Sequence, residues 1–177
     1  MAEGKKRRGR RAYLEDFQKT ASGEYVYTGT LHHYPDGGRF SRAQALARLW
    51  AAAAAMAALA LLGGFLPAAG MQNTFYVILP WAAGLVSVGA VVWLMCRLTA
   101  GGNPLRDYVH AATVGRFGVR GGAVTACAAL TAAGELLCLA LQGAGGSLAA
   151  SLVFLASQGL LFAAGLWWLR FTRRLEW

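Results

Sequence analysis

The distribution of charged residues constrains this chain more than any other feature. No Asp, Glu, Lys or Arg occurs between Arg48 and Arg97, and the stretch between Arg120 and Arg170 contains only Glu135. Charged residues make up 14% of the chain, whereas soluble domains carry about 25%. Long apolar stretches bounded by charges are typical of membrane spans. The sequence therefore predicts an integral membrane protein.

Turn residues divide the two apolar regions into four predicted helices, and the fold class we expect is an all-α, four-transmembrane-helix bundle. The spans are expected at about 49–66, 75–98, 121–141 and 148–169, within one membrane domain at 41–177. The shortest of them would extend roughly 27 Å, enough to cross the hydrocarbon core. Ser41-Arg42-Ala43-Gln44 matches a capping box and predicts the start of the first helix, which Pro67 is expected to end.

The positions of the basic residues predict the orientation of the bundle. Ten of the 17 Lys and Arg precede the first span, four lie in the last turn of the second span or in the connection to the third, and three follow the fourth. The other two connections, 67–74 and 142–147, contain none. Because basic segments remain on the cytoplasmic side, we expect a multi-pass protein of the cell membrane with both termini in the cytoplasm. The first apolar run begins near Leu49 and is expected to act as an uncleaved anchor.

Residues 1–40 form the predicted cytoplasmic tail. Tyr25-Val26-Tyr27-Thr28 is rich in β-formers, and Gly29-Thr30 suits a two-residue turn before the segment 31–34. We therefore predict a β-hairpin at 25–34, which would be marginal in water by itself. The basic run at the start of the tail is expected to contact anionic lipid head groups. Its residues are Lys5, Lys6, Arg7, Arg8, Arg10 and Arg11.

The connection between the second and third spans is predicted to contain a short amphipathic helix. Asn103-Pro104 is a favourable start, with Asn103 as the N-cap and Pro104 in the first helical position. An apolar face would follow, and we expect it to lie on the membrane surface. Its members are Leu105, Tyr108, Val109 and Ala112.

Glu135 is the one acidic residue inside a predicted span. A charge at the centre of a membrane costs about 2.5 kcal/mol or more, so an acid in a span is a candidate functional group. Glu135 belongs to the most polar stripe of the predicted helices, which should face inward. The other members of that stripe are Cys127, Thr131, Cys138 and Gln142.

The candidate polar site comprises Glu135, Thr131, Ser151 and Gln158. Ser151 and Gln158 lie on the fourth helix, and Ser151 is nearer the depth of Glu135 when the distance of each from the intervening turn is compared. The preferred interpretation is a protonated acid that is hydrogen-bonded between helices and stabilises the bundle. One alternative is a proton- or cation-coupled transport site. The other is a contact with a basic or polar residue of another membrane subunit.

Catalytic and cofactor motifs are not found in the sequence, so we expect neither an enzyme nor a cofactor. His32 and His33 are adjacent, and neighbouring residues of a strand point to opposite faces, so no metal site is expected there. The three cysteines have no zinc-binding spacing. Small residues at four-residue spacing, as in Gly118-xxx-Gly122 and Gly159-xxx-Ala163, fit close helix packing.

The function expected from these features is that of an accessory or scaffold subunit that acts through its cytoplasmic face. The alternative is a small transporter, or a component of one, that uses Glu135. The net charge of +9 comes from residues that flank apolar segments, so we expect anionic lipids rather than nucleic acid as the partner of these charges. A membrane or cytoplasmic protein partner fits the first function, and self-association into a homo-oligomer is left open.

Overall fold

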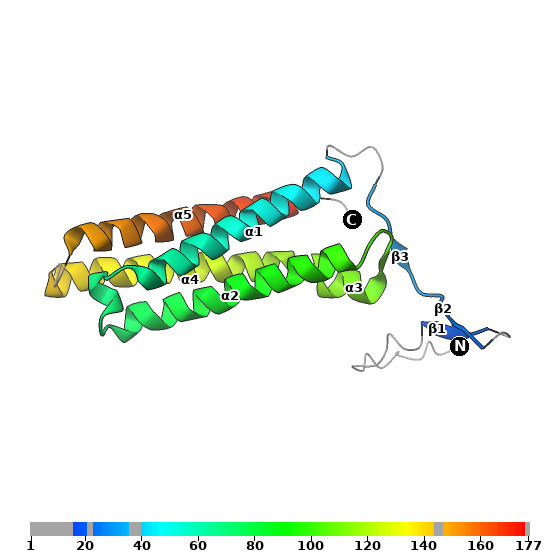
Figure 1. Cartoon of the computed structure of the whole chain (residues 1–177), viewed down its shortest axis with the longest axis horizontal. Helices are drawn as coiled ribbons and strands as arrows, with labels where there is room; N and C mark the ends of the chain where they lie inside the picture. Colours follow the sequence, from blue (N-terminus) through cyan, green and yellow to red (C-terminus); the bar gives the residue numbers. More distant parts are fainter. Residues whose placement is uncertain (1–15, 21–22, 36–39, 144–146, 176–177) are drawn as a thin grey trace, which may run out of the picture.

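Four long antiparallel helices form the body of the computed structural model, which describes residues 16–20, 23–35, 40–143 and 147–175 (Figure 1). The helices are α1 (Arg42–Phe65), α2 (Phe75–Ala100), α4 (Phe117–Gln142) and α5 (Leu148–Thr172). Each packs against the long helix before or after it in the chain, and contacts between α1 and α5 close the ring. All four are long and apolar enough to cross a membrane, with α4 extended by the short helix α3 (Asp107–Ala112). The predicted helical bundle is confirmed to this extent.

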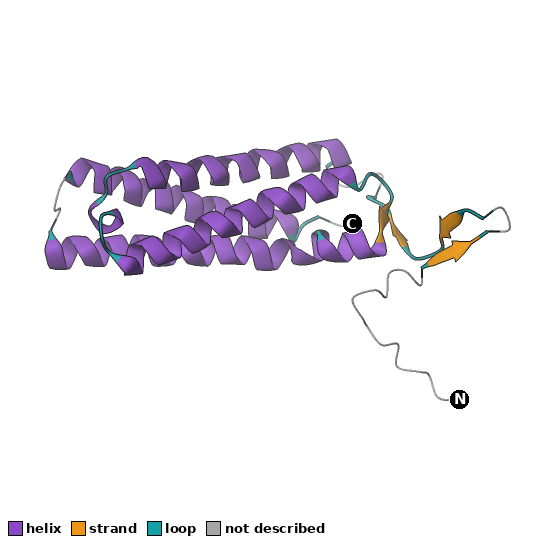
Figure 2. Ribbon diagram, turned by 60° about the horizontal axis from the view of Figure 1, so that its bottom comes forward, coloured by secondary structure: helices purple, strands orange, loops and turns teal. Residues whose placement is uncertain are grey.

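The two ends of the bundle differ in the segments that they carry. Residues 66–74, the C-terminal end of α4 and the start of α5 lie at one end, here called the loop end (Figure 1). The short strands and the C-terminal end of α5 lie at the other, here called the strand end (Figures 1 and 2). The described part of the tail, the central connection and the C-terminal end of α5 thus lie at one end of the structure.

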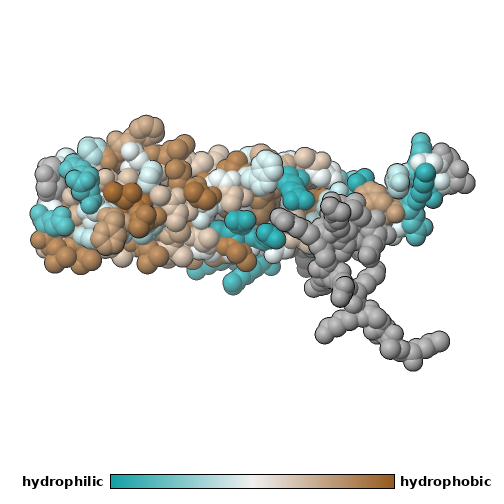
Figure 3. All heavy atoms as spheres, turned by 90° about the horizontal axis from the view of Figure 1, so that it is seen from below, coloured by the Kyte–Doolittle hydropathy of each residue, from teal (hydrophilic) through white to brown (hydrophobic). Residues whose placement is uncertain are grey.

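The helices are apolar on their outer faces as well as in the core. Leu49, Met95 and Trp168 are fully buried between the helices, whereas Val86 and Leu130 on the outside are 73% and 61% exposed. Along one side of the bundle, apolar and neutral colours predominate, and hydrophilic patches lie at the loop end and over the half nearer the strands (Figure 3). Helices that are apolar on all sides are typical of proteins that span a membrane.

Close helix packing depends on other glycines than those of the predicted four-residue pairs. Gly118, Gly122 and Gly159 have nothing within 4 Å of an added Cβ atom, so they do not make close contacts. The close approach of α4 to α5 is made by Gly121, where a Cβ would lie 3.1 Å from Leu169, and by Gly165 against Thr125 on α4. The four-residue pattern alone does not identify which face of a helix is buried.

The hairpin predicted at 25–34 is wrong in its pairing, although both of its strands exist. Strand β2 (Tyr25–Tyr27) pairs in antiparallel fashion with β1 (Phe17–Lys19), in the register Phe17 to Tyr27. Strand β3 (Leu31–His32) pairs instead with β4 (Leu105–Arg106) from the central connection. The two strands therefore belong to two separate two-stranded sheets, β1 with β2 and β3 with β4.

The pairing of β3 with β4 also changes the start of the helix in the central connection. Leu105 and Arg106 are extended, so α3 begins at Asp107 rather than at Pro104. Asn103 does not cap the helix, because its Oδ1 atom accepts a hydrogen bond from the Tyr34 backbone N–H at 3.3 Å. Leu105 therefore lies on β4 and not on the predicted helix face, and both Leu105 and Val109 pack into the core of the bundle. The expectation of a helix lying on the lipid surface is therefore wrong for this face.

The ends of the long helices follow the sequence more closely. The capping box at the start of α1 is confirmed, since Ser41 Oγ accepts from Gln44 N at 3.3 Å and Gln44 Oε1 accepts from Ser41 N at 3.2 Å. Ser147 caps α5 in a similar way through the Ala150 N–H. A short 3₁₀ helix, η3 (Val114–Arg116), links α3 to α4, which begins at Phe117 rather than near Gly121.

Candidate functional site

Glu135 lies fully buried on α4 in the half of the bundle nearer the loop end. Its Oε2 atom accepts a hydrogen bond from the Gly70 backbone N–H at 2.9 Å. Gly70 belongs to η2 (Ala69–Met71), a 3₁₀ turn within the connection from α1 to α2. The carboxyl group therefore binds the backbone of a loop that folds into the end of the bundle, and not a second helix as expected.

Ser151 binds the same loop from the opposite helix. It is fully buried on α5, and its Oγ atom accepts a hydrogen bond from the Ala69 N–H at 2.9 Å. Ala69 and Gly70 are the first two residues of η2, whose N–H groups have no acceptor within the short helix itself. Glu135 and Ser151 thus cap one turn together, and the predicted similarity in their depth agrees with this arrangement.

Thr131 and Gln158, the other two predicted members, are buried but take no part in this cap. Thr131 Oγ1 donates to the Cys127 carbonyl of its own helix at 2.8 Å. Gln158 Nε2 lies 3.5 Å from Ser157 Oγ, and it faces Gly63 of α1, where an added Cβ would lie 3.1 Å away. The inward orientation of the stripe around Glu135 is found at Thr131, Glu135 and Cys138, which are all buried.

Further polar groups surround the second carboxyl oxygen of Glu135. Oε1 is buried and has no hydrogen-bond partner among the described residues. The hydroxyl of Tyr76, at the start of α2, is buried and lies close enough to Glu135 and Cys138 to interact with them electrostatically. Thr74 Oγ1 lies 3.8 Å from Cys138 Sγ. The side chains of Glu135, Tyr76, Thr74 and Cys138 are here called the loop-end cluster, and they combine a carboxyl group that can carry a proton with polar neighbours.

The space around the cluster is filled closely. A Cβ atom added to Gly70 would overlap Glu135 Oε2 and lie 2.7 Å from Val77, and one added to Gly134 would lie 2.8 Å from the Tyr76 carbonyl. Such contacts leave little room for a permeating ion beside Oε2. Tight packing around a buried acid is what a structural role requires.

Gly70, Thr74 and Tyr76 could not be identified as partners from helical spacing, because they lie in a loop or just after it. One signal was present in the sequence. The connection begins Pro67-Ala68-Ala69-Gly70-Met71, which is apolar although a loop in water is usually polar. Ala68 and Gly70 are indeed buried.

A second group of contacts, at the strand end, holds the tail on the central connection. His32 Nε2 lies 3.0 Å from Asp107 Oδ1, and the His32 ring stacks on His110 with ring centres 4.0 Å apart. The Tyr27 hydroxyl accepts from the Asp107 N–H at 3.2 Å. The Arg106 guanidinium lies 5.5 Å from the centre of the Tyr27 ring. The residues 16–35 that are described therefore form a folded part of the strand end.

The linker between the tail and α1 is fastened in the same region. Tyr34 is 6% exposed, its hydroxyl donates to the Phe40 carbonyl at 2.9 Å, and burial raises the pKa of the phenol above its ordinary value. Arg42 Nη2 donates to the Gly102 carbonyl at 2.6 Å. The start of α1 is thereby tied to the end of α2 through the connection between α2 and α3.

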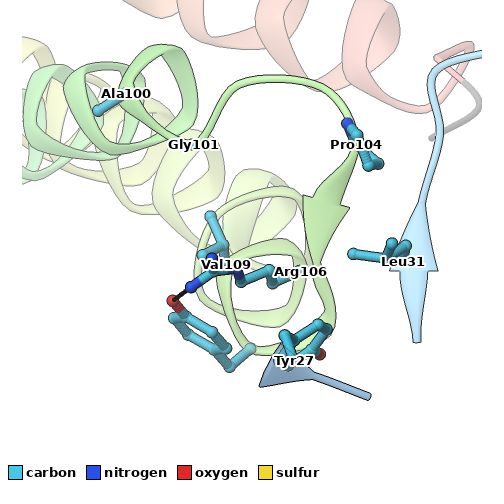
Figure 4. A pocket seen from close by; sticks show the side chains of 8 residues that line it. Tyr27, Leu31, Ala100, Gly101, Pro104, Arg106 and Val109 are labelled. Carbon is cyan, nitrogen blue, oxygen red and sulfur yellow. Dashed lines mark hydrogen bonds between the residues drawn. The ribbon is translucent and has the colours of Figure 1, made fainter. Parts of the chain in front are cut away.

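A pocket of about 560 Å³ lies between the tail and the central connection (Figure 4). Leu31 lines one side, opposite Pro104 and Arg106, and the end of α2 closes it at Ala100 and Gly101 (Figure 4). The pocket combines apolar walls with one guanidinium and tyrosine hydroxyls, as sites that bind a partner's side chain or a small molecule do.

The six basic residues predicted to contact lipid, from Lys5 to Arg11, lie outside the described residues. Comparison of the chain with protein-family models, with curated proteins and with solved structures finds no match. The chemistry of these sites is therefore inferred from the residues of this chain alone.

Proposed function

We propose that this chain is a non-enzymatic accessory or scaffold subunit of the cell membrane, with four spans and both termini in the cytoplasm. The asymmetry of its basic residues supports this orientation, since all 17 Lys and Arg lie outside the two connections at the loop end. Under the proposal, the loop end faces away from the cytoplasm, and the strand end is the cytoplasmic surface on which a partner protein binds.

The observation that carries the proposal is the exposed ribbon formed by β1 and β2. Tyr25 is 71% exposed and Val26, which points to the opposite face, is 47% exposed. The ribbon stands beyond the end of the bundle (Figure 2), and it is anchored mainly through Tyr27. A two-stranded ribbon with apolar residues exposed on both faces is poorly stabilised in water. A partner that covers these faces, or adds a strand to an open edge, would stabilise it.

The pocket beside Leu31 extends the proposed partner surface. Leu31 is 45% exposed and lines the pocket together with Arg106. An apolar or acidic side chain of the partner would find both an apolar wall and a positive charge there. We therefore define the partner surface as Tyr25, Val26, Leu31 and Arg106.

Photocrosslinking in native membranes tests this function. A photoreactive amino acid replaces Tyr25 in the full chain, and the matched control carries it at Arg174, which is also exposed, directly follows the end of α5 and lies outside the partner surface. We expect a crosslinked product of one defined mass from position 25 and not from position 174. The same set of products from both positions, or none from position 25, would contradict the proposal.

Transport through Glu135 is the second candidate, and one observation favours it. Oε1 of this buried acid has no hydrogen-bond partner among the described residues, and a buried polar atom of this kind inside a membrane helix is a candidate to bind a proton or an ion. The test is proton and monovalent-cation flux in proteoliposomes, comparing the wild type with Glu135→Gln. The scaffold proposal expects equal flux in both, close to that of empty liposomes. A flux that requires Glu135 would favour transport instead.

A further inference from the structure

We propose that the groove between the cytoplasmic ends of α2 and α4 is a binding site for the phosphate of an anionic phospholipid. Three arginines reach the groove from different segments: Arg97 from the last turn of α2, Arg116 from η3 and Arg120 from the first turns of α4. They surround a cavity of about 180 Å³. The site is distinct from the basic run at 5–11 and from the partner surface.

The three arginines lack acidic partners within the part of the chain that the structure describes. The ion pair found there joins His32 to Asp107, away from this groove. Three positive charges around one small cavity repel each other, and this repulsion is reduced when an anion lies between them. An anion placed between the three guanidinium groups would be attracted by all of them, and no acidic side chain lines the groove.

The start of α4 supplies no negative charge to the groove, because its first turn contains no acidic residue. The Phe117 N–H donates to the Val114 carbonyl of η3, so α4 continues η3 rather than beginning as a free helix N-terminus. The positive potential in the groove therefore comes from the three guanidinium groups.

The apolar part of the groove identifies a lipid rather than a soluble anion. The apolar wall of the cavity is formed by Ala90, Trp93 and Leu94, which precede Arg97 along α2 and so lie further from the strand end. Trp93 is 71% exposed on the outer face of the bundle, where acyl chains would lie. A phosphodiester in the arginine cluster would thus place its acyl chains along α2, and arginine binds phosphate oxygens in a bidentate manner.

Lipid binding by the purified full chain in mild detergent tests this site. Native mass spectrometry would compare phosphatidylglycerol with phosphatidylcholine for the wild type and for the triple variant R97Q/R116Q/R120Q. The matched control, R170Q/R173Q/R174Q, removes an equal number of positive charges, three, from the C-terminal segment at the same end of the bundle. We expect the wild type and the control to prefer phosphatidylglycerol by about tenfold or more, and the triple variant to lose most of that preference, since only the contribution of the basic run at 5–11 remains.

Two further arms keep the outcomes distinct. The variant R97K/R116K/R120K retains the charges and should retain most of the preference, even if the glutamine variant fails to fold. Inorganic phosphate at millimolar concentration should not displace the lipid, because it cannot use the apolar wall. Equal lipid preference in all variants would overturn the site, and displacement by inorganic phosphate would overturn its assignment to a lipid.

Discussion

At the scale of single residues, the main finding is the role of Glu135. Burying an acid inside a membrane helix costs free energy. Here one carboxyl oxygen of Glu135 accepts a hydrogen bond from a backbone N–H of a loop that folds into the bundle. Ser151 accepts a hydrogen bond from the neighbouring N–H of the same loop, that of Ala69. Two side chains from two helices therefore replace the water that would otherwise satisfy the start of η2. Glu135 consequently stabilises the loop end rather than a pair of helices.

Replacing Glu135 by Ala should loosen this loop. The Gly70 N–H would remain buried without an acceptor, which costs about 1–3 kcal/mol. Glu135→Gln keeps an acceptor oxygen and should lose less. The measurement is the free energy of unfolding by SDS titration in mixed micelles, together with hydrogen exchange in residues 66–74. Unchanged stability and exchange in the Ala variant would show that the hydrogen bond is not important.

Gly70→Ala tests the same contact from the side of the loop. The added methyl group would overlap Glu135 Oε2 and approach Val77 to 2.7 Å, and overpacking of this kind costs about 1–3 kcal/mol. Gly89→Ala in α2 is the control, because nothing lies within 4 Å of its added Cβ. We expect a lower midpoint of thermal unfolding for the first variant alone. Equal midpoints for both variants would mean that the loop is less closely packed than described.

At the scale of elements, the spacing of residues predicts which segments are helices and which stripe faces inward, but not which partner each segment chooses. The capping box at Ser41 and the burial of Thr131 and Glu135 follow from local pattern, because helical periodicity is a local property. The pairing of β3 with β4 joins residues far apart in the chain, and no local signal specifies it. For the same reason the loop residues that bind Glu135 could not be identified, although the apolar start of that loop was informative.

The interface of α4 with α5 gives a prediction that separates buried from outward glycines. Gly121→Ala would press against Trp168 and Leu169, and Gly165→Ala against Thr125, so both should destabilise the bundle by about 1–3 kcal/mol. Gly122→Ala and Gly159→Ala add a methyl group to open space on the same two helices. These controls should unfold at wild-type SDS concentrations. The interface would be wrongly assigned if the controls were destabilised as much as the buried pair.

Docking of the tail on the central connection gives a second prediction at this scale. His32→Ala removes both the contact with Asp107 and the stacking on His110. Hydrogen exchange of the backbone in residues 25–34 should therefore become faster. His33→Ala, at the adjacent exposed position, is the control and should leave the exchange unchanged. Similar exchange in both variants would argue that the tail is held by other contacts.

At the scale of the whole molecule, the bundle separates two kinds of chemistry. The loop end contains a closely packed acid and an apolar loop. The strand end contains a folded tail, a pocket and three arginines around a groove. The positions of the basic residues in the sequence predict this division, and in the structure the described part of the tail, the central connection and the C-terminal end of α5 lie at one end (Figure 1). Partner and lipid binding are therefore both proposed for the strand end.

The central claim is that the chain spans the membrane four times with the strand end in the cytoplasm, and cysteine accessibility tests it most directly. Cys96, Cys127 and Cys138 are first replaced by alanine, and single cysteines are introduced at Asn73, Gly115 and Arg174, which are exposed at the two ends of the bundle. Intact cells are then treated with a membrane-impermeant maleimide. We predict labelling of position 73 in intact cells, and of positions 115 and 174 only after permeabilisation. Labelling of position 115 or 174 in intact cells, with position 73 protected, would contradict the account.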